Sequence, residues 1–358
     1  MNENIFLLES SKDSSPIILL SWWLSGLFLL IILFTIFYVK TLRNQLRVKG
    51  DIEAKYQEDY EVCLVTYLYA GNEEETFSSE QLLIISELKE SVADPFGRKI
   101  IISTLLKLRN EISGEMAESI DKLYVKLGLL RYSLAKLRNK KWDVIANGIR
   151  ELTQFKIKAV HQIVMNNINH PTKEVRKEMQ LYLVHLYAFK GLDFLNVLET
   201  PLSEWDQIQL LEILQLKNDS EIVDITPWLK SSNDSVVNFT LKLAKVYNQF
   251  EAKEELINLL NHGSEEVRIN TISALSHLNA LEAKNILKDS FNERSLEEQI
   301  AFLKMMENVH EHDDKVFLQE QMQHENFEIK SIAMEILKNI NFEEYELHEV
   351  KIKKPITV

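Results

Sequence analysis

The pattern of hydrophobic and polar positions divides the chain into one continuous apolar segment and a long stretch of helical periodicity. Residues 17–39 form a run of 23 side chains without a single charge. A helix of that length spans about 34 Å, enough to cross a hydrocarbon core of about 30 Å. From residue 78 nearly to residue 341, apolar residues recur at helical spacing, and no stretch alternates convincingly with a period of two. The pattern therefore predicts an all-α protein with an N-terminal transmembrane helix and a body of helix pairs.

The residues that flank the apolar segment predict its orientation. Lys40, Arg43, Arg47 and Lys49 follow it, and residues 40–49 contain no acid. Cationic flanks remain in the cytoplasm, so the N-terminus is expected outside and the body inside. A cleaved signal peptide fits poorly, because its apolar region has 7–15 residues behind a positively charged start. A buried core helix fits poorly with so long an uncharged run and this cluster of cations.

A polar corner followed by a β-branched residue recurs along the body and indicates repeats of about 30 residues. The clearest copies are HPTKEVR at 170–176, HGSEEVR at 262–268 and HENFEIK at 324–330. Helix pairs this short cannot bury both faces alone, so neighbouring repeats must stack. The aliphatic residues that open the second helices are separated by 29 to 33 residues and are Val144, Val175, Ile208, Val237, Val267, Ile300 and Ile329.

These corners, with Pro227 inside the helix predicted at 225–229, resemble HEAT repeats. The resemblance covers residues 139–340 and extends back towards Asp94 and Pro95. The layout of one anchor and a helical body is similar to that of bacterial single-pass inner-membrane proteins of this family. The resemblance implies a curved α-solenoid that binds proteins, and it implies that Arg176, Arg268 and Lys330 pair with carboxylates of the adjacent repeat. A few HEAT-like proteins are bilin lyases or DNA glycosylases.

The pattern predicts five segments. A short extracytoplasmic tail (1–16) precedes the transmembrane helix (17–39), and a basic juxtamembrane segment with a helix and an acidic linker follows (40–77). The solenoid occupies 78–341, is clearest over 139–340, and opens with a capping box at Ser78 and Gln81. Residues 342–358 are expected to form a flexible tail, loose from Glu346 onwards.

Composition and charge narrow the possible chemistry. With 9 Gly and 6 Pro in 358 residues, the chain is short of the turn residues that all-β folds need. Its net charge of −13 disfavours nucleic acid as a partner. The glycines lie too far apart for a phosphate-binding loop, and Cys63, the single cysteine, lies beside acidic residues that would raise its pKa. We expect no cofactor.

Two clusters remain as weak candidate sites. His310, His312 and Asp314 are candidate metal ligands, although a solvated turn between helices is the favoured interpretation. Histidines also recur at the repeat corners (His170, His262 and His324), where a role in the turn is favoured over one as a pH sensor.

The second cluster is basic: Lys136, Arg138, Lys140 and Lys141 belong to a cation-rich stretch that could contact anionic lipid or an acidic partner, or simply face solvent.

The sequence therefore predicts a non-catalytic, membrane-anchored HEAT-repeat scaffold that binds a membrane-associated protein partner at the cytoplasmic face of a bacterial inner membrane. The alternative is a HEAT-like enzyme, lyase-type or metal-dependent, with its site on the concave surface. Saturable stabilisation by a metal or metabolite would discriminate the two.

Overall fold

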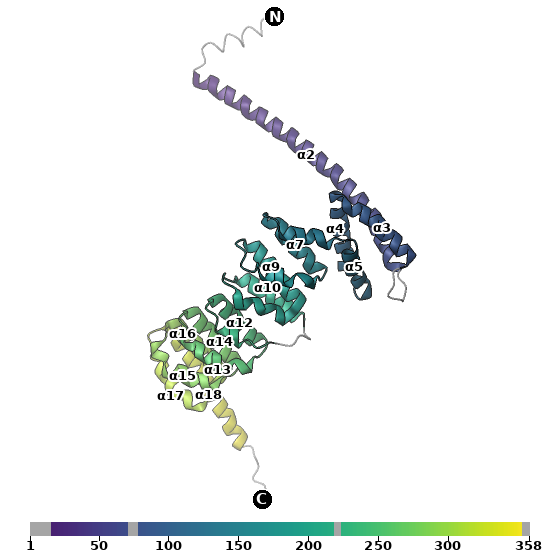
Figure 1. Cartoon of the computed structure of the whole chain (residues 1–358). Helices are drawn as coiled ribbons and strands as arrows, with labels where there is room; N and C mark the ends of the chain where they lie inside the picture. Colours follow the sequence, from purple (N-terminus) through teal and green to yellow (C-terminus); the bar gives the residue numbers. More distant parts are fainter. Residues whose placement is uncertain (1–15, 71–77, 218–222, 353–358) are drawn as a thin grey trace. The chain divides into compact units, whose positions relative to one another are not determined.

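The computed structural model describes residues 16–70, 78–217 and 223–352, and throughout these ranges the chain forms helices and turns with no strand (Figure 1). The all-α, solenoid-like architecture is therefore as predicted. The chain forms two compact units, Met1–Tyr132 and Ser133–Val358. The acidic linker expected around 71–75 lies outside the described residues.

The first unit contains α2 (Pro16–Tyr69), α3 (Ser79–Ala93), α4 (Pro95–Glu111) and α5 (Glu115–Lys126). The transmembrane and juxtamembrane helices that the sequence suggests are one helix of 54 residues. Gly50 has the lowest helix propensity of the residues near the expected boundary, and one glycine costs only about 1 kcal/mol. The end of α2 packs against α3 and α4, so it belongs to the folded unit.

Two local signals in the sequence fix where α3 and α4 begin. The Ser78 hydroxyl accepts from the Gln81 amide at 3.1 Å, and the Gln81 side chain accepts from the Ser78 amide at 3.1 Å. This capping box confirms the predicted start of the body. Asp94 accepts from the Gly97 amide at 2.8 Å, and Pro95 occupies the first turn of α4. A capped corner between two helices therefore exists at Asp94–Pro95.

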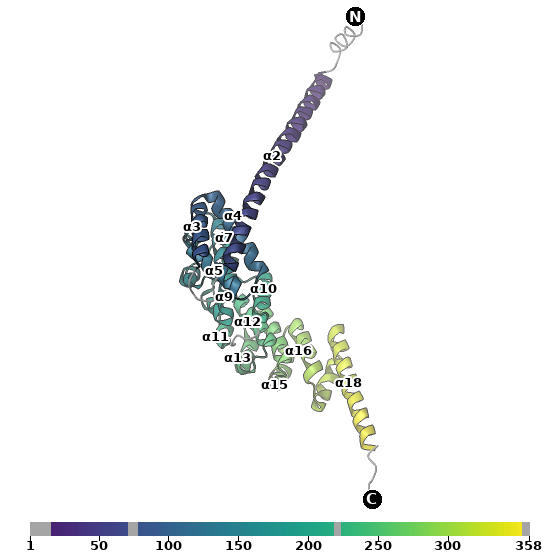
Figure 2. The same cartoon turned by 90° about the vertical axis from the view of Figure 1, so that its right-hand side faces the viewer.

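The second unit repeats a simple arrangement of a short helix followed by a longer one. Each short helix packs on the longer helix after it, and most longer helices pack on the next longer one (Figures 1 and 2). α6 (Leu130–Leu137) crosses the boundary between the units. The short helices are α8 (His161–Met165), α11 (Thr226–Leu229), α13 (Lys253–Asn258), α15 (Leu281–Asp289) and α17 (Lys315–Gln321). The longer ones are α7 (Trp142–Gln154), α9 (Lys173–Tyr187), α10 (Glu204–Gln215), α12 (Asp234–Val246), α14 (Glu265–His277), α16 (Leu296–Val309) and α18 (Phe327–Ile352).

The predicted aliphatic anchors are buried where the corner motif is clearest. Val175, Val267 and Ile329 are each the third residue of their helices and are fully buried, as is Val237. Val144 and Ile300 are only partly buried. The predicted repeat frame is thus confirmed for the three strongest copies.

At Ile208 the predicted frame is wrong, because this side chain is 51% exposed. Helix α10 begins at Glu204, so Ile208 is its fifth residue. The buried residues near the start of this helix are Asp206 and Gln207. Gln207 is buried there instead, and its side-chain amide donates to the Leu202 carbonyl at 3.0 Å. Helix α16 repeats the arrangement with Gln299, which donates to the Phe291 carbonyl at 3.0 Å. The buried NH2 group of each glutamine is thus satisfied by the backbone, whereas the Gln207 Oε1 finds no hydrogen-bond partner among the described residues.

Because Val267 is buried and Ile208 is exposed, truncating these two residues should have unequal effects on stability. Val267→Ala should lower the free energy of unfolding by about 2 kcal/mol, because it opens a cavity between α14 and its neighbours. Ile208→Ala should change it by about 0.5 kcal/mol or less, because the side chain faces solvent. Urea unfolding of the full chain in detergent, followed by circular dichroism, measures both. Equal effects would contradict this register.

The C-terminal helix extends further than the sequence suggests. α18 continues to Ile352, beyond Glu346, where the loose tail was expected to begin. No proline interrupts the stretch before Pro355, and the residues from 342 to 349 include several good helix formers. Residues 353–358 lie outside the described residues.

Candidate functional site

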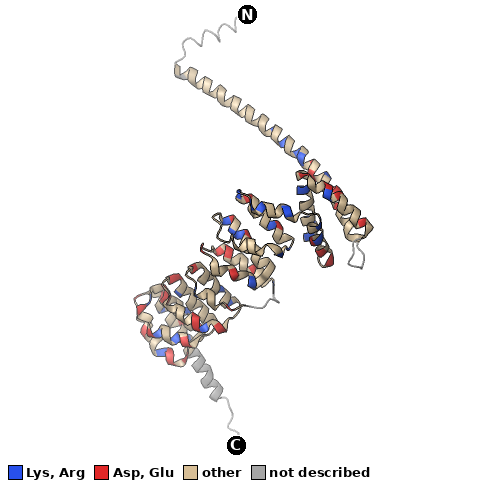
Figure 3. Ribbon diagram, viewed as in Figure 1, with Lys and Arg blue, Asp and Glu red and all other residues tan. Residues whose placement is uncertain are grey.

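The apolar part of α2 packs against none of the residues that the structure describes. None of its most apolar window is buried, and by length and composition this helix could cross a membrane. Figure 3 shows the first half of α2 free of charged residues up to the cluster of cations. Trp22 and Trp23 are exposed near one end and Tyr38 near the other. A core helix of a soluble protein would be largely buried, and this one is not.

Three of the four cations after this segment lie on one side of α2. Lys40, Arg43 and Arg47 line a shallow surface together with Phe37 and Asn44. Their spacing of three and four residues places them on one face of the helix. Each is exposed, so this face can contact negatively charged groups.

The basic residues proposed for binding are divided between different environments. Lys136 is held in an ion pair with Glu151, whose other carboxylate oxygen accepts from the Ser133 hydroxyl at 2.6 Å. Because Glu151 is buried, this contact joins α6 to α7 and makes Lys136 part of the packing. Arg138, Lys140 and Lys141 are exposed, so these three keep the predicted availability for a partner.

Among the candidate metal ligands at 310–314, Asp314 forms ion pairs with two lysines. The two oxygens of the buried Asp314 carboxylate accept from Lys284 at 2.9 Å and from Lys288 at 2.8 Å. Burial raises the pKa of Asp314, but the two ammonium groups outweigh it and hold that pKa below its usual value. His310 lies 3.0 Å from the Met306 carbonyl through its Nδ1. Among the described residues, no group of three or more His, Cys, Asp or Glu is arranged to hold a metal ion.

The histidines at the repeat corners act on their own turns. Nδ1 accepts from the backbone amide two residues later in each case, at 3.1 Å for His170, 3.1 Å for His262 and 3.0 Å for His324. This contact satisfies an amide in the turn that leads into the longer helix. The predicted role in the turn is thus confirmed for all three.

The arginines that follow the buried aliphatic residues also donate hydrogen bonds to the corner turns. Arg176 donates to the carbonyls of His170 at 2.8 Å and Pro171 at 2.9 Å, and Arg268 donates to the His262 carbonyl at 2.8 Å. Arg98 repeats this contact with the Val92 carbonyl at 3.0 Å. Arg268 makes the predicted pair with the adjacent repeat, where it binds Glu298. Within the described part of the chain, neither Arg176 nor Lys330 forms an ion pair of this kind.

Cys63 lies half-buried on α2. Burial raises the pKa of its thiol, and the nearby Glu87 and Asp59 carboxylates raise it further. The direction agrees with the prediction from its acidic neighbours. A thiol with a raised pKa is a poor nucleophile at neutral pH.

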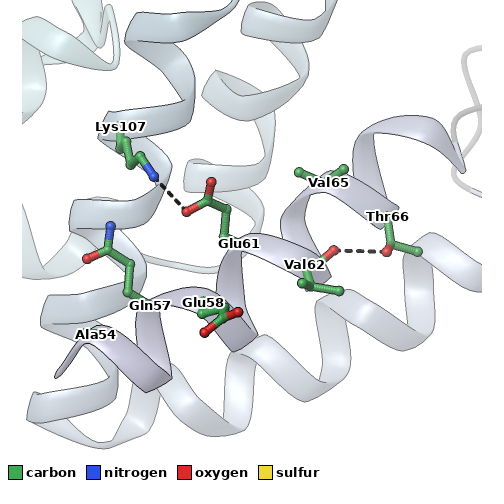
Figure 4. Close-up of a pocket in the computed structure, with 8 residues that line it drawn as sticks. All are labelled: Ala54, Gln57, Glu58, Glu61, Val62, Val65, Thr66 and Lys107. Atoms are coloured by element: carbon green, nitrogen blue, oxygen red, sulfur yellow. Dashed lines mark hydrogen bonds and ion pairs between the residues drawn. The ribbon is translucent and has the colours of Figure 1, made fainter. Parts of the chain in front are cut away.

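The sequence reasoning missed a groove along the last turns of α2 (Figure 4). It has a volume of about 630 Å³ and lies where α2 passes Lys107 of α4. Lys107 pairs with Glu61 at 2.8 Å, whereas Val62 is 64% exposed and Val65 37% exposed. The signal in the sequence is an apolar spacing of three and four residues at Val62, Val65 and Tyr69, on the side opposite the buried Leu64.

Comparisons with known proteins give no family. No family model and no curated protein matches the sequence. Solved structures with partial likeness include an engineered protein with 15% identity and a TM-score of 0.35, covering 78% of this chain and 88% of that chain. Human deoxyhypusine hydroxylase in complex with glycerol matches at 12% identity and a TM-score of 0.29, covering 80% and 98%. At these scores the matches support no inference about this chain.

Proposed function

We propose that this chain is a membrane-anchored helical-repeat scaffold of the HEAT type, which holds a protein partner at the cytoplasmic face of a bacterial inner membrane. The observation that carries the proposal is the continuity of α2. The exposed apolar segment and the packed end are one helix, so the anchor is rigidly continuous with the first folded unit. Confinement near the bilayer raises the effective concentration of the scaffold towards other membrane proteins.

The proposed orientation rests on charge. Lys40, Arg43, Arg47 and Lys49 follow the apolar segment, and the positive-inside rule keeps such a cluster in the cytoplasm. The folded units then lie inside the cell and residues 1–15 outside. The solenoid-like stacking of the second unit supports a binding role, because such arrays present extended surfaces to proteins.

Cysteine labelling tests the topology. In a Cys63→Ala background, Ser11→Cys should react with a membrane-impermeant maleimide added to spheroplasts. Ser232→Cys, an exposed position in the second unit, should react only after the membrane is permeabilised. Labelling of residue 232 in sealed spheroplasts would overturn the proposal, because the folded units would then lie outside the cell.

Crosslinking in intact membranes, followed by mass spectrometry, tests the binding role. A scaffold should give adducts with membrane proteins, and charge reversal of Arg138, Lys140 and Lys141 should alter them if these exposed cations contact the partner. Lys136 is left unchanged, because its pair with Glu151 supports packing. Saturable thermal stabilisation by a metal or metabolite, without protein adducts, would favour an enzyme instead.

A further inference from the structure

The apolar segment of α2 is followed by a group of cations on one face of the helix. Lys40, Arg43 and Arg47 line one shallow surface, and we call them the cationic face. Phe37 lies at the apolar end of this surface, and Asn44 lies between the two arginines. All three cations are exposed, and none of them forms an ion pair with a residue that the structure describes. Three positive charges are thus gathered on about two helical turns.

The charge of α2 changes sharply after this stretch. Residues 14–50 contain four cations and no acid, the fourth cation being Lys49. Residues 51–61 then hold five acids, with Lys55 as their single cation. Asp51 is the acid nearest in sequence to the cationic face, lies one turn beyond Arg47, and forms no ion pair with it. The positive charge is therefore concentrated in the part of α2 next to the apolar segment.

The distance along α2 places the cationic face at the depth of lipid headgroups. The headgroup layer of one leaflet is about 5–8 Å thick. Lys40 directly follows the apolar segment, and Arg43 and Arg47 lie about 5 and 11 Å further along the helix axis. Helical side chains lean towards the N-terminus, which in α2 is the direction of the apolar segment. The long side chains of both arginines therefore lean back towards the headgroups, and all three charges reach the lipid phosphates.

From these observations, and resting on the membrane anchor of the proposed function, we propose that the cationic face binds the headgroup phosphate of an anionic phospholipid. The guanidinium groups of Arg43 and Arg47 offer paired N–H donors that match phosphate oxygens, and Lys40 adds a positive charge at the edge of the hydrocarbon. A zwitterionic headgroup also carries a phosphate, but its own cation offsets that charge, so the anionic lipid binds more tightly. Lipid phosphate is already present at this depth, whereas an acidic protein segment would have to displace it.

The lipid contact and the folded part of the first unit occupy separate stretches of one helix. Glu53 of α2 pairs with Lys99 of α4 at 3.0 Å, about 21 Å along the helix beyond Val39. The cationic face lies between these two points. Because α2 is continuous, a headgroup bound there fixes the depth at which the first unit is held from the bilayer. Substitutions on the cationic face leave the contacts between α2 and α4 in place.

Native mass spectrometry of the full chain tests the preference for anionic lipid. The chain is released from detergent micelles that contain phosphatidylglycerol and phosphatidylcholine in equal amounts and with the same acyl chains. Each Lys or Arg near an anionic surface strengthens the attraction about fivefold, so the phosphatidylglycerol adduct should be about tenfold or more in excess. Lys40→Gln, Arg43→Gln and Arg47→Gln, combined in one chain, should lower this ratio about tenfold. Glutamine is a good helix former, so α2 persists in this variant.

The matched control carries Arg138→Gln, Lys140→Gln and Lys141→Gln, which remove three charges from exposed positions of the second unit. This variant should leave the ratio of the two adducts unchanged. Equal adducts of the two lipids with the natural chain, or an equal drop in both triple variants, would overturn the proposal. Adducts of sn-glycerol 3-phosphate as abundant as those of the lipid would also overturn it, because the site would then take free phosphate.

Photocrosslinking in native membranes tests the occupant. A photoreactive phenylalanine analogue replaces Asn44, which lies between the two arginines of the cationic face. The adduct should be a phospholipid. An adduct with an acidic segment of another protein, with a different part of this chain, or with nothing would refute the lipid contact. Such a result would leave the cysteine labelling at residue 232 unchanged, so the lipid contact and the proposed scaffold fail separately.

Discussion

Replacement of Glu298 by alanine is expected to lower the free energy of unfolding by about 3–5 kcal/mol. The Glu298 side chain is 3% exposed and binds two arginines. Its oxygens accept from Arg268 Nε at 2.9 Å and Nη2 at 3.1 Å, and from Arg294 Nη1 at 3.1 Å. Arg268 belongs to α14 and Glu298 to α16, so the network joins adjacent repeats. Removal of the carboxylate leaves Arg294 buried without its countercharge, which is the main source of the loss.

The matched control for this variant is Glu297→Ala. Glu297 lies one residue away on the solvent side of the same helix, so its removal should cost about 0.5 kcal/mol or less. Urea unfolding of the full chain in detergent at pH 7 gives both values. Equal losses from Glu297→Ala and Glu298→Ala would show that the buried network does not hold α14 to α16.

The same carboxylate gives the protein a defined pH dependence. Burial raises the pKa of Glu298, but bonds from Arg268, the Ser295 amide and Arg294 outweigh it and lower that pKa from 4.5 to about 2. Because the folded pKa is the lower one, the stabilisation is complete above about pH 4.5 and is lost as the pH falls towards 2. The lost contribution is about 3 kcal/mol. The stability difference between the natural protein and Glu298→Gln should therefore be constant from pH 5 to 8 and should shrink below pH 4.5.

The repeat corners could be predicted from sequence because their contacts are local. Nδ1 of His170 reaches an amide two residues away, and Arg176 reaches carbonyls five and six residues back. Interactions of this range depend on residue types at fixed spacing, which a single sequence displays. The Ser78–Gln81 capping box is local for the same reason.

The frame at Ile208 and Ile300 could not be predicted in this way. The pattern selects the nearest aliphatic residue after each corner, whereas the buried positions are taken by Gln207 and Gln299. A glutamine appears polar in the sequence, and its burial depends on a carbonyl five to eight residues earlier. The serine caps at 203 and 295 are the signal that locates the start of each helix and corrects the frame.

The candidate sites depend on contacts that are distant in sequence. A cluster of possible metal ligands is formed in the sequence by His310, His312 and Asp314. The lysines that bind Asp314, however, lie 26 and 30 residues earlier, on α15. Lys136 likewise belongs to the fold through Glu151, 15 residues away. The groove along α2 was missed because apolar residues occur on both sides of this helix near Val62, and periodicity alone does not show which side packs.

Replacement of Gly191 by alanine should lower the free energy of unfolding by about 3 kcal/mol, similar to Glu298→Ala, because of steric overlap. Gly191 lies in the 3-10 segment η2 (Ala188–Val197), which returns directly against α9. An added Cβ would lie 2.2 Å from the Leu183 carbonyl oxygen and 2.5 Å from its carbon. Both are backbone atoms, so no side-chain rotation relieves the contact and the return of the chain must shift.

Gly263→Ala is the matched control, because an added Cβ there meets no atom within 4 Å. It should leave the stability unchanged or raise it by up to about 1 kcal/mol by restricting the unfolded chain. In a stacked array the damage from Gly191→Ala should concentrate near the mutated repeat. Hydrogen exchange should therefore show protection lost in α9 and its neighbour α7 and retained in α16 and α18. A uniform loss of protection, or equal stability of the two alanine variants, would contradict the close approach of η2 to Leu183.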